Sequence, residues 1–163
     1  AKKNIAHFGF ENEIELIQSD GLTMVDIPSG AVAVIAGMGT STILSILENP
    51  KTNLFSQIIV QTNNDWEIFR KKMSQRGFRL VEEQVVLEKN KYYVLMKWEK
   101  GNCFYSSKQC FLGPLLMQKK EFSYYQYLLN QYQIIDSKLP KQHRIQKYKV
   151  RKKIRWLLKE LKR

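Results

Sequence analysis

The chain of 163 residues is 44% hydrophobic and carries a formal net charge of +12, which is enough length for one packed domain with an appendage. No apolar run approaches the roughly 18 residues of a membrane span, and no signal peptide is visible. Cys103 and Cys110 lack a CxxC spacing and a nearby histidine, so we expect free thiols in the cytoplasm, no metal site and no membrane partner.

The N-terminal segment predicts a helix end and a strand. Residues 1–8 are expected to be helical, and Gly9 stops them. Residues 13–18 alternate polar and apolar side chains, which is the pattern of a half-buried strand. That strand leads into an acidic turn at 19–22.

A strand followed by a glycine-rich bend comes next. Ala31–Ala36 is uncharged and apolar, and it predicts a strand buried on both faces, as in a parallel sheet. The run breaks at Gly37 and Gly39, and residues 40–47 predict a helix that any of three hydroxyl residues can cap. Ligands of open α/β sheets bind at such strand ends, because backbone and helix N-terminus approach them there. A tight turn explains the two glycines equally well.

A second strand and helix precede a hairpin. Residues 57–61 predict a short apolar strand, and residues 66–76 predict a helix. Residues 78–87 and 91–98 predict two strands joined by a tight turn. The order βαβαβ followed by a hairpin predicts an α/β fold: a doubly wound, Rossmann-like sheet with one antiparallel strand inserted near an edge.

The basic charge is concentrated in the C-terminal region. Residues 1–102 contain 12 Lys and Arg and 12 Asp and Glu, whereas residues 103–163 contain 15 and 3, so the second part holds the whole excess of +12. The chain is therefore divided into a neutral globular part, 1–102, and a basic helical region, 103–163. This asymmetry indicates a polyanion partner, with nucleic acid favoured over an anionic membrane. The alternative is a solvated face that only aids solubility.

Two helices are predicted in the basic region. Residues 113–137 predict one helix, and Pro140 separates it from a second helix over 141–163, so the two can form an antiparallel, coiled-coil-like hairpin. The expected seam residues of the second helix are Ile145, Tyr148, Ile154, Leu157, Leu158 and Leu161. The residues expected to contact phosphate, without base specificity, are Lys141, Arg144, Lys147, Lys149, Arg151, Lys152, Lys153 and Arg155.

Four short motifs occur in a defined order. Residues 19–22 are similar to a GDGL turn, 35–39 to IAGMGG, 59–63 to LxLQPN and 112–116 to GPxLL. At these spacings the set resembles the bacterial tRNA (adenine-22 N1)-methyltransferase family, TrmK, over roughly residues 1–130. The resemblance implies a class I methyltransferase fold, in which residues 1–102 form a partial catalytic domain.

The resemblance also implies a reaction and a cofactor. The reaction is transfer of a methyl group from S-adenosylmethionine to N1 of an adenine in tRNA, at position 22. By the same resemblance Asp20 contacts the adenine amino group of the cofactor, and Gly21, Ala36 and Gly37 also bind the cofactor. A turn or an N-cap explains Asp20 without any cofactor.

Other residues are assigned to the target base. Gly37, Met38 and Gly39 lie where related methyltransferases face this base, and Met38 can pack on a flat ring. The amides of Gln61 and Asn63 can recognise the Watson–Crick edge of a flipped-out adenine, or they can cap a loop. Most of the rate can come from positioning, because N1 of neutral adenine carries an in-plane lone pair and needs no strong base.

The sequence departs from the family pattern at several positions. Thr40 replaces a glycine of GMGG, Thr62 replaces the proline of QPN, and Tyr93 stands where the family has glutamate. Family members also open with a DIGSDHAYLP segment that wraps the methionine part of the cofactor. This sequence begins after it, so we expect half of the cofactor pocket to be missing.

These departures leave a second interpretation open. The chain can be a non-catalytic nucleic-acid-binding protein on a degenerate methyltransferase scaffold. A third interpretation is a membrane-surface protein that uses the basic tail helix. It is weaker than the other two, because Lys and Arg surround this helix and leave no broad apolar face for the membrane.

Overall fold

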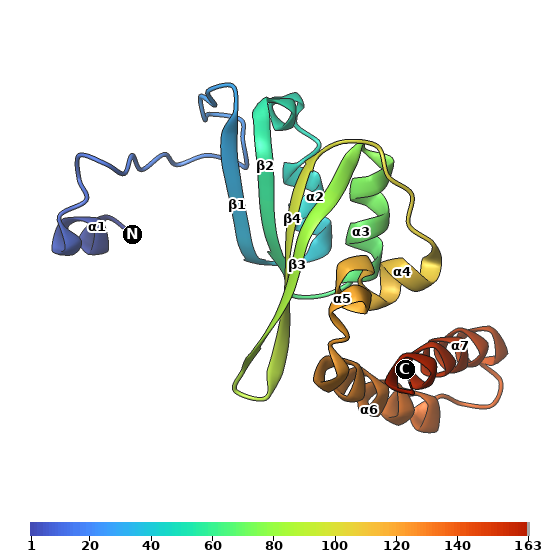
Figure 1. Ribbon diagram of the computed structural model, residues 1–163. Helices are drawn as coiled ribbons and strands as arrows, with labels where there is room; N and C mark the ends of the chain where they lie inside the picture. Colours follow the sequence, from blue (N-terminus) through green and yellow to red (C-terminus); the bar gives the residue numbers. More distant parts are fainter. Residues whose placement is uncertain (163) are drawn as a thin grey trace.

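The computed structural model describes residues 1–162 as a four-stranded sheet with packed helices and a helical hairpin at its C-terminal side (Figure 1). In the described residues no helix is both long enough and apolar enough to cross a membrane. The elements in chain order are α1 (Lys2–Phe8), β1 (Ala31–Met38), α2 (Thr40–Ile46), the 3-10 helix η1 (Pro50–Leu54), β2 (Phe55–Thr62), α3 (Trp66–Gln75), β3 (Phe78–Glu88), β4 (Lys91–Lys100), α4 (Ser107–Leu112), α5 (Pro114–Lys119), α6 (Phe122–Lys138) and α7 (Arg144–Leu161).

The sheet has the strand order β1-β2-β4-β3. β1 and β2 are parallel, and β4 is antiparallel to both β2 and β3. The predicted insertion of one antiparallel strand is therefore confirmed, as is the β3–β4 hairpin. Its turn places Lys89 and Asn90 at φ values of 47° and 64°, because a two-residue hairpin loop that follows the strand twist needs left-handed residues.

The core lies between one face of the sheet and helices α2 and α3. Ile58 of β2 and Trp98 of β4 are fully buried against Phe69 and Met73 of α3, and Ile43 of α2 extends the same cluster. The rings of Phe69 and Trp98 meet edge to face with centroids 6.0 Å apart. This packing confirms the predicted helices after β1 and β2, and it fixes the ends of both strands.

β1 forms as predicted, but the expectation that it is buried on both faces is wrong. Ala33 is buried, whereas the side chains of Val32 and Val34 are 52% and 70% exposed. Among the described residues β1 pairs only with β2, so it is an edge strand of the sheet. An apolar run shows that both faces of a strand can be buried. Whether both are buried depends on which elements pack against them.

The predicted strand over residues 13–18 is also wrong. These residues are irregular and exposed, and no strand in the described chain pairs with them. An extended segment becomes a strand only when its N–H and C=O groups are paired. α1 does form, and it ends at Gly9 with a φ of 73°, as predicted. α1 buries no residue and lies apart from the sheet (Figure 1).

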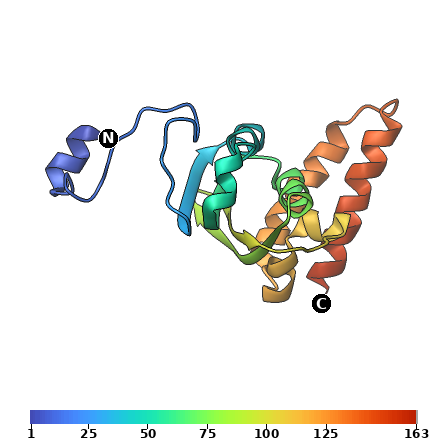
Figure 2. The same cartoon turned by 90° about the horizontal axis from the view of Figure 1, so that it is seen from above.

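The single helix predicted over 113–137 is divided into α5 and α6. Lys120, with a φ of 56°, breaks the helical conformation between them. The predicted hairpin is confirmed, since α6 and α7 lie side by side and the chain turns between them near Pro140 (Figures 1 and 2).

The seam between α6 and α7 differs in part from the prediction. The confirmed seam residues of α7 are Ile154, Leu157 and Leu161, which are buried or half-buried. Residues three or four apart lie on one face of a helix, and half-buried Val150, four residues before Ile154, belongs to the same face. The wrong ones are Ile145, Tyr148 and Leu158, whose side chains are exposed.

Candidate functional site

The carboxyl ends of β1 and β2 are joined by side-chain amides. Gly37 donates its backbone N–H to Oε1 of Gln61 at 2.8 Å, and Nδ2 of Asn63 donates to the carbonyl of Gly37 at 2.8 Å. Nε2 of Gln61 donates to Oδ1 of Asn63 at 3.2 Å and closes the cluster. We call Gly37, Gln61 and Asn63 the strand-end cluster. The structure thus brings together three predicted site residues from two motifs.

Gly37 leaves its backbone open at this point. Its φ is +78°, and a Cβ built on it meets no atom within 4 Å other than its chain neighbours. Ala36 and Met38 on either side are exposed. A flat ligand can therefore approach the backbone at the end of β1, and the left-handed conformation explains why a glycine stands there.

Gly39 and Thr40 begin α2, but no hydroxyl group caps this helix. Gly39 is the N-cap, and the backbone N–H of Thr40 donates to Oδ1 of Asn64 at 2.9 Å. The expected hydroxyl cap is therefore wrong, because an amide from the adjacent strand end takes the same role. Asn64 was not predicted. Its place directly after the QTN motif is the signal that points to it.

The two departures from the methyltransferase motifs meet in space. The hydroxyl groups of Thr40 and Thr62 lie 2.8 Å apart, and Thr40 Oγ1 also donates to the carbonyl of Asn64 at 2.6 Å. Both threonines are buried. This side-chain pair links the start of α2 to the end of β2, next to the strand-end cluster.

Asp20 and Gly21 lie away from the strand-end cluster. They border a cavity of about 150 Å³ together with Ile46 and Asn49, at the C-terminal end of α2. Lys51, just before β2, holds the loop that follows them by donating to the carbonyls of residues 23 and 25. Since α2 begins at the strand-end cluster and runs away from it, the structure does not bring Asp20 and Gly21 together with Ala36 and Gly37.

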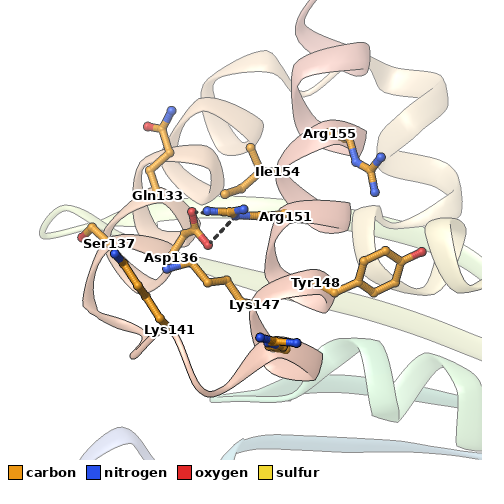
Figure 3. Close-up of a pocket in the computed structure, with 10 residues that line it drawn as sticks. Gln133, Asp136, Ser137, Lys141, Lys147, Tyr148, Arg151, Ile154 and Arg155 are labelled. Atoms are coloured by element: carbon orange, nitrogen blue, oxygen red, sulfur yellow. Dashed lines mark hydrogen bonds and ion pairs between the residues drawn. The ribbon is translucent and has the colours of Figure 1, made fainter.

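A basic groove lies on the helical hairpin (Figure 3). Its cavity volume is about 1060 Å³, and five of the predicted phosphate-contacting residues line it. We call this surface the basic groove; its lining residues are Gln133, Asp136, Ser137, Lys141, Arg144, Lys147, Tyr148, Arg151, Ile154 and Arg155.

The charges of the basic groove are only partly neutralised. Arg151 donates to Asp136 at 3.2 Å (Figure 3). Lys147 Nζ donates to the carbonyl of Leu139 at 3.2 Å. Asp136 is the one acid among the lining residues, against five cations. Tyr148, which was predicted as a seam residue, instead presents a 61% exposed ring among these cations.

The remaining three predicted cations lie outside the basic groove. Lys149 and Lys152 are exposed, and the ammonium group of Lys152 lies 5.1 Å from the ring centroid of Trp156. Lys153 turns inward, where its Nζ is 2.5 Å from Oε2 of Glu67 on α3. Burial lowers the pKa of Lys153, but the hydrogen bonds that it donates to Glu67 and Tyr132, together with their electrostatic attraction, outweigh burial, so that the pKa is raised on balance.

The residues described by the structure contain no group of three or more His, Cys, Asp and Glu side chains placed to hold a metal ion. Both cysteines are free. Burial raises the pKa of Cys110, which makes this thiol a weak nucleophile.

The fold and the strand ends together define a class of protein. A parallel pair of strands, an inserted antiparallel strand and a polar cluster at the carboxyl ends make this a Rossmann-like class I methyltransferase fold. The sequence profile of the family TrmK, tRNA (adenine(22)-N(1))-methyltransferase, matches residues 1–160. The chain therefore belongs to the TrmK family.

Individual relatives agree with this assignment. The tRNA (adenine(22)-N(1))-methyltransferase of Bacillus subtilis (strain 168) is 28% identical over 128 residues, which are 74% of this chain and 54% of the relative. The chain thus spans about half the length of the curated relative that it matches.

Two solved structures share the fold. A protein of the NADB-Rossmann superfamily from Streptococcus agalactiae is 23% identical with a TM-score of 0.87, and the match covers 98% of this chain and 73% of that one. TrmK of M. capricolum, solved with the natural cofactor product S-adenosyl-homocysteine, is 21% identical with a TM-score of 0.76, over 99% and 74% of the two chains.

Proposed function

We propose that this chain acts in S-adenosylmethionine-dependent methylation of N1 of an adenine in tRNA, at the position 22 for which its relatives are named. In this proposal residues 1–102 present the adenine, and residues 103–163 hold the tRNA. The site of action is the cytoplasm. Membership of the TrmK family and the geometry of the strand-end cluster support the proposal.

The strand-end cluster is the observation that carries the proposal. Each side-chain amide has two N–H donors and a carbonyl acceptor, and Gln61 and Asn63 each commit one N–H within the cluster. Their planar groups are therefore held in fixed orientations at the strand ends. A fixed donor–acceptor pair is what recognition of a base edge requires, because a flipped-out base is read through hydrogen bonds and stacking.

The chain's part in the reaction is to position the base. N1 of neutral adenine carries an in-plane lone pair, so a base held in plane can attack without prior loss of a proton. Met38 is exposed beside Gly37 and can pack on the flat face of the ring. Such positioning can supply a large share of the rate, since it removes the entropy of bringing two reactants into line.

The residues of this chain fit the cofactor only in part. The open backbone at Gly37 suits a close approach, but Asp20 and Gly21 border a cavity of about 150 Å³ elsewhere. Pockets for ligands of this kind begin at about 300 Å³. The cofactor supplies the methyl group when bound, and the described residues do not form a complete pocket for it.

The basic groove supports tRNA as the substrate. Its exposed cations suit contacts with the phosphate backbone, which position an RNA without reading its sequence. In this proposal one tRNA molecule contacts both the basic groove and the strand-end cluster.

Methyl transfer is tested with the protein at its full natural length, tRNA and methyl-labelled S-adenosylmethionine. We expect 1-methyladenosine in the digested tRNA, detected by mass spectrometry. Residues 1–163 alone are expected to bind the cofactor too weakly for calorimetry, because Asp20 and Gly37 lie apart. Micromolar binding by this chain would contradict that expectation.

The position of Asp20 favours one second candidate, a non-catalytic RNA-binding protein on a methyltransferase scaffold. The same assay separates the two functions. Tight tRNA binding without any 1-methyladenosine would support the scaffold function and reject the enzyme.

A further inference from the structure

Two cavities adjoin along α3, outside both the strand-end cluster and the basic groove. One of about 360 Å³ lies where α3 begins, and one of about 620 Å³ lies between α3 and the segment leading into α4. Glu67 and Ile68 line both cavities, so the two form one continuous surface, which we call the α3 groove. Each cavity falls in or near the range of about 300 to 1,000 Å³ that small ligands occupy.

Aromatic rings line both halves of the α3 groove. Trp66, Phe111 and Tyr132 line the first cavity, and Phe104 and Tyr105 line the second. The side chain of Phe104 is 89% exposed, although burial of such a ring is strongly favoured in water. An exposed ring at the mouth of a cavity is a surface on which another flat ring can stack.

The charges of the α3 groove are predominantly positive where they are exposed. Lys71 and Lys72 line the second cavity and are exposed to solvent. Lys153, Glu67 and Asp65 line the first, and the ion pair of Lys153 with Glu67 at 2.5 Å neutralises two of these three charges. The exposed cations Lys71 and Lys72 thus line the same cavity as the rings of Phe104 and Tyr105.

The α3 groove is continuous with the strand-end cluster. Asn63 lines the first cavity, and its amide also donates to the carbonyl of Gly37. A polynucleotide with one base at the strand-end cluster therefore continues directly into the α3 groove.

We propose that the α3 groove binds unpaired nucleotides that flank the target adenine, with bases stacked on Trp66 and Phe104 and phosphates near Lys71 and Lys72. Stacking on aromatic side chains beside cations is the general way in which proteins hold single strands. The proposal rests on the proposed function, because it takes RNA as the substrate. An apolar peptide is disfavoured as the occupant, since two exposed lysines line the cavity beside Phe104.

The first test compares two exposed phenylalanines. Phe104→Ala removes the proposed stacking ring, and Phe8→Ala removes an exposed ring on α1, which is 67% exposed and outside the groove. We expect Phe104→Ala to weaken binding of single-stranded oligoadenylate by about fivefold or more, and Phe8→Ala to leave it unchanged. Equal affinities of wild type and Phe104→Ala would overturn the proposal.

The second test observes the groove itself. The chain has three tryptophans, and fluorinated tryptophan gives one NMR resonance for each. Oligoadenylate is expected to shift the resonance of Trp66, whereas Trp98, which is fully buried in the core, serves as the internal control. An RNA duplex of the same length is expected to leave Trp66 unshifted, because its bases are already stacked and paired.

The outcomes distinguish this proposal from the proposed function. Binding of tRNA without a shift of Trp66 overturns the α3 groove and leaves tRNA recognition intact. If the protein does not bind tRNA at all, both the α3-groove proposal and the proposed function are rejected. A shift of Trp66 with a leucine-rich peptide but not with oligoadenylate makes the groove a protein-docking site and rejects the RNA assignment.

Discussion

At the scale of single residues, Gly37 holds the most constrained position at the strand ends. Its φ of +78° lies in the left-handed region, and its N–H and C=O both take part in the strand-end cluster. Residues with a Cβ adopt this conformation at a cost of about 1–2 kcal/mol. The glycine is therefore required by the backbone as well as by the space that it leaves open.

Gly37→Val is expected to lower stability modestly and to abolish methyl transfer. Backbone strain of about 1–2 kcal/mol lowers Tm by about 2–8 °C in a chain of this size. The added methyl groups occupy the open space at the strand end, while the circular dichroism spectrum stays close to that of wild type. Thermal melting and methyl transfer by the full-length protein measure the two effects.

Gly37→Asn is the control for the conformation alone, since asparagine tolerates the left-handed region better than valine. It should retain more stability than Gly37→Val. Wild-type turnover of Gly37→Val would mean that the bend is only a turn.

At the scale of elements, one buried ion pair ties the C-terminal helices to the sheet. Arg70 of α3 and Glu83 of β3 meet at 2.6 Å, and both side chains are fully buried. Arg70 also donates to the carbonyl of Cys110 at 2.6 Å, and Glu83 accepts the backbone N–H of Leu115 and Leu116. The Arg70–Glu83 ion pair and its hydrogen bonds therefore connect four elements, α3, β3, α4 and α5.

Arg70→Met is expected to destabilise the protein by about 3–5 kcal/mol, because it leaves the carboxylate of Glu83 buried without its partner. Arg79→Met is the matched control. Arg79 forms a similar pair with Glu99 at 3.2 Å, but its side chain is 56% exposed, so the loss should stay below about 1 kcal/mol. Urea denaturation measures the free energy of unfolding of both variants. Equal losses of stability would contradict the assigned role of the Arg70–Glu83 ion pair.

The basic groove determines how RNA binding responds to salt. The variant Lys141→Gln/Arg144→Gln/Arg155→Gln removes three exposed charges without touching the seam. Each phosphate contact contributes about 0.9 to the slope of log affinity against log salt on a duplex, so the slope should become shallower by about 2.7. Filter binding of tRNA across a salt series measures it.

The control variant Lys2→Gln/Lys3→Gln/Lys89→Gln removes the same charge from α1 and the β3–β4 turn, far from the groove in sequence. It should leave the salt slope near that of wild type. An unchanged slope in the groove variant would mean that the hairpin only packs or aids solubility.

At the scale of the whole molecule, stability is unevenly distributed along the chain. α1 buries no residue, and residues 9–18 are exposed and irregular, whereas the buried residues of the hydrophobic core all lie from β1 onward. Segments with few buried contacts open locally at low cost in free energy.

Limited proteolysis with subtilisin is therefore expected to cut first between residues 9 and 19. The fragment that begins near residue 20 should persist, since the sheet and hairpin are packed together. Mass spectrometry of a time course identifies the cuts. First cleavage inside the α6–α7 connection would contradict this order.

The sequence by itself determined the elements whose signals are local. β1, β2, the β3–β4 hairpin and the helices after β1 and β2 follow from apolar periodicity, glycines and turn residues that act over a few positions. The meeting of Gly37, Gln61 and Asn63 was predictable as well, because parallel neighbouring strands bring their carboxyl ends to one edge. The family followed from four motifs that keep their order.

Only the tertiary structure decided what depends on partners distant in sequence. Residues 13–18 have a strand pattern but no strand to pair with among the described residues, and Val34 is exposed because the second face of β1 is uncovered there. Lys153 resembles its basic neighbours in sequence, yet Glu67 on α3 draws it inward. Strand pairing, burial and charge neutralisation each need two surfaces in contact. A local sequence pattern specifies only one of the two surfaces.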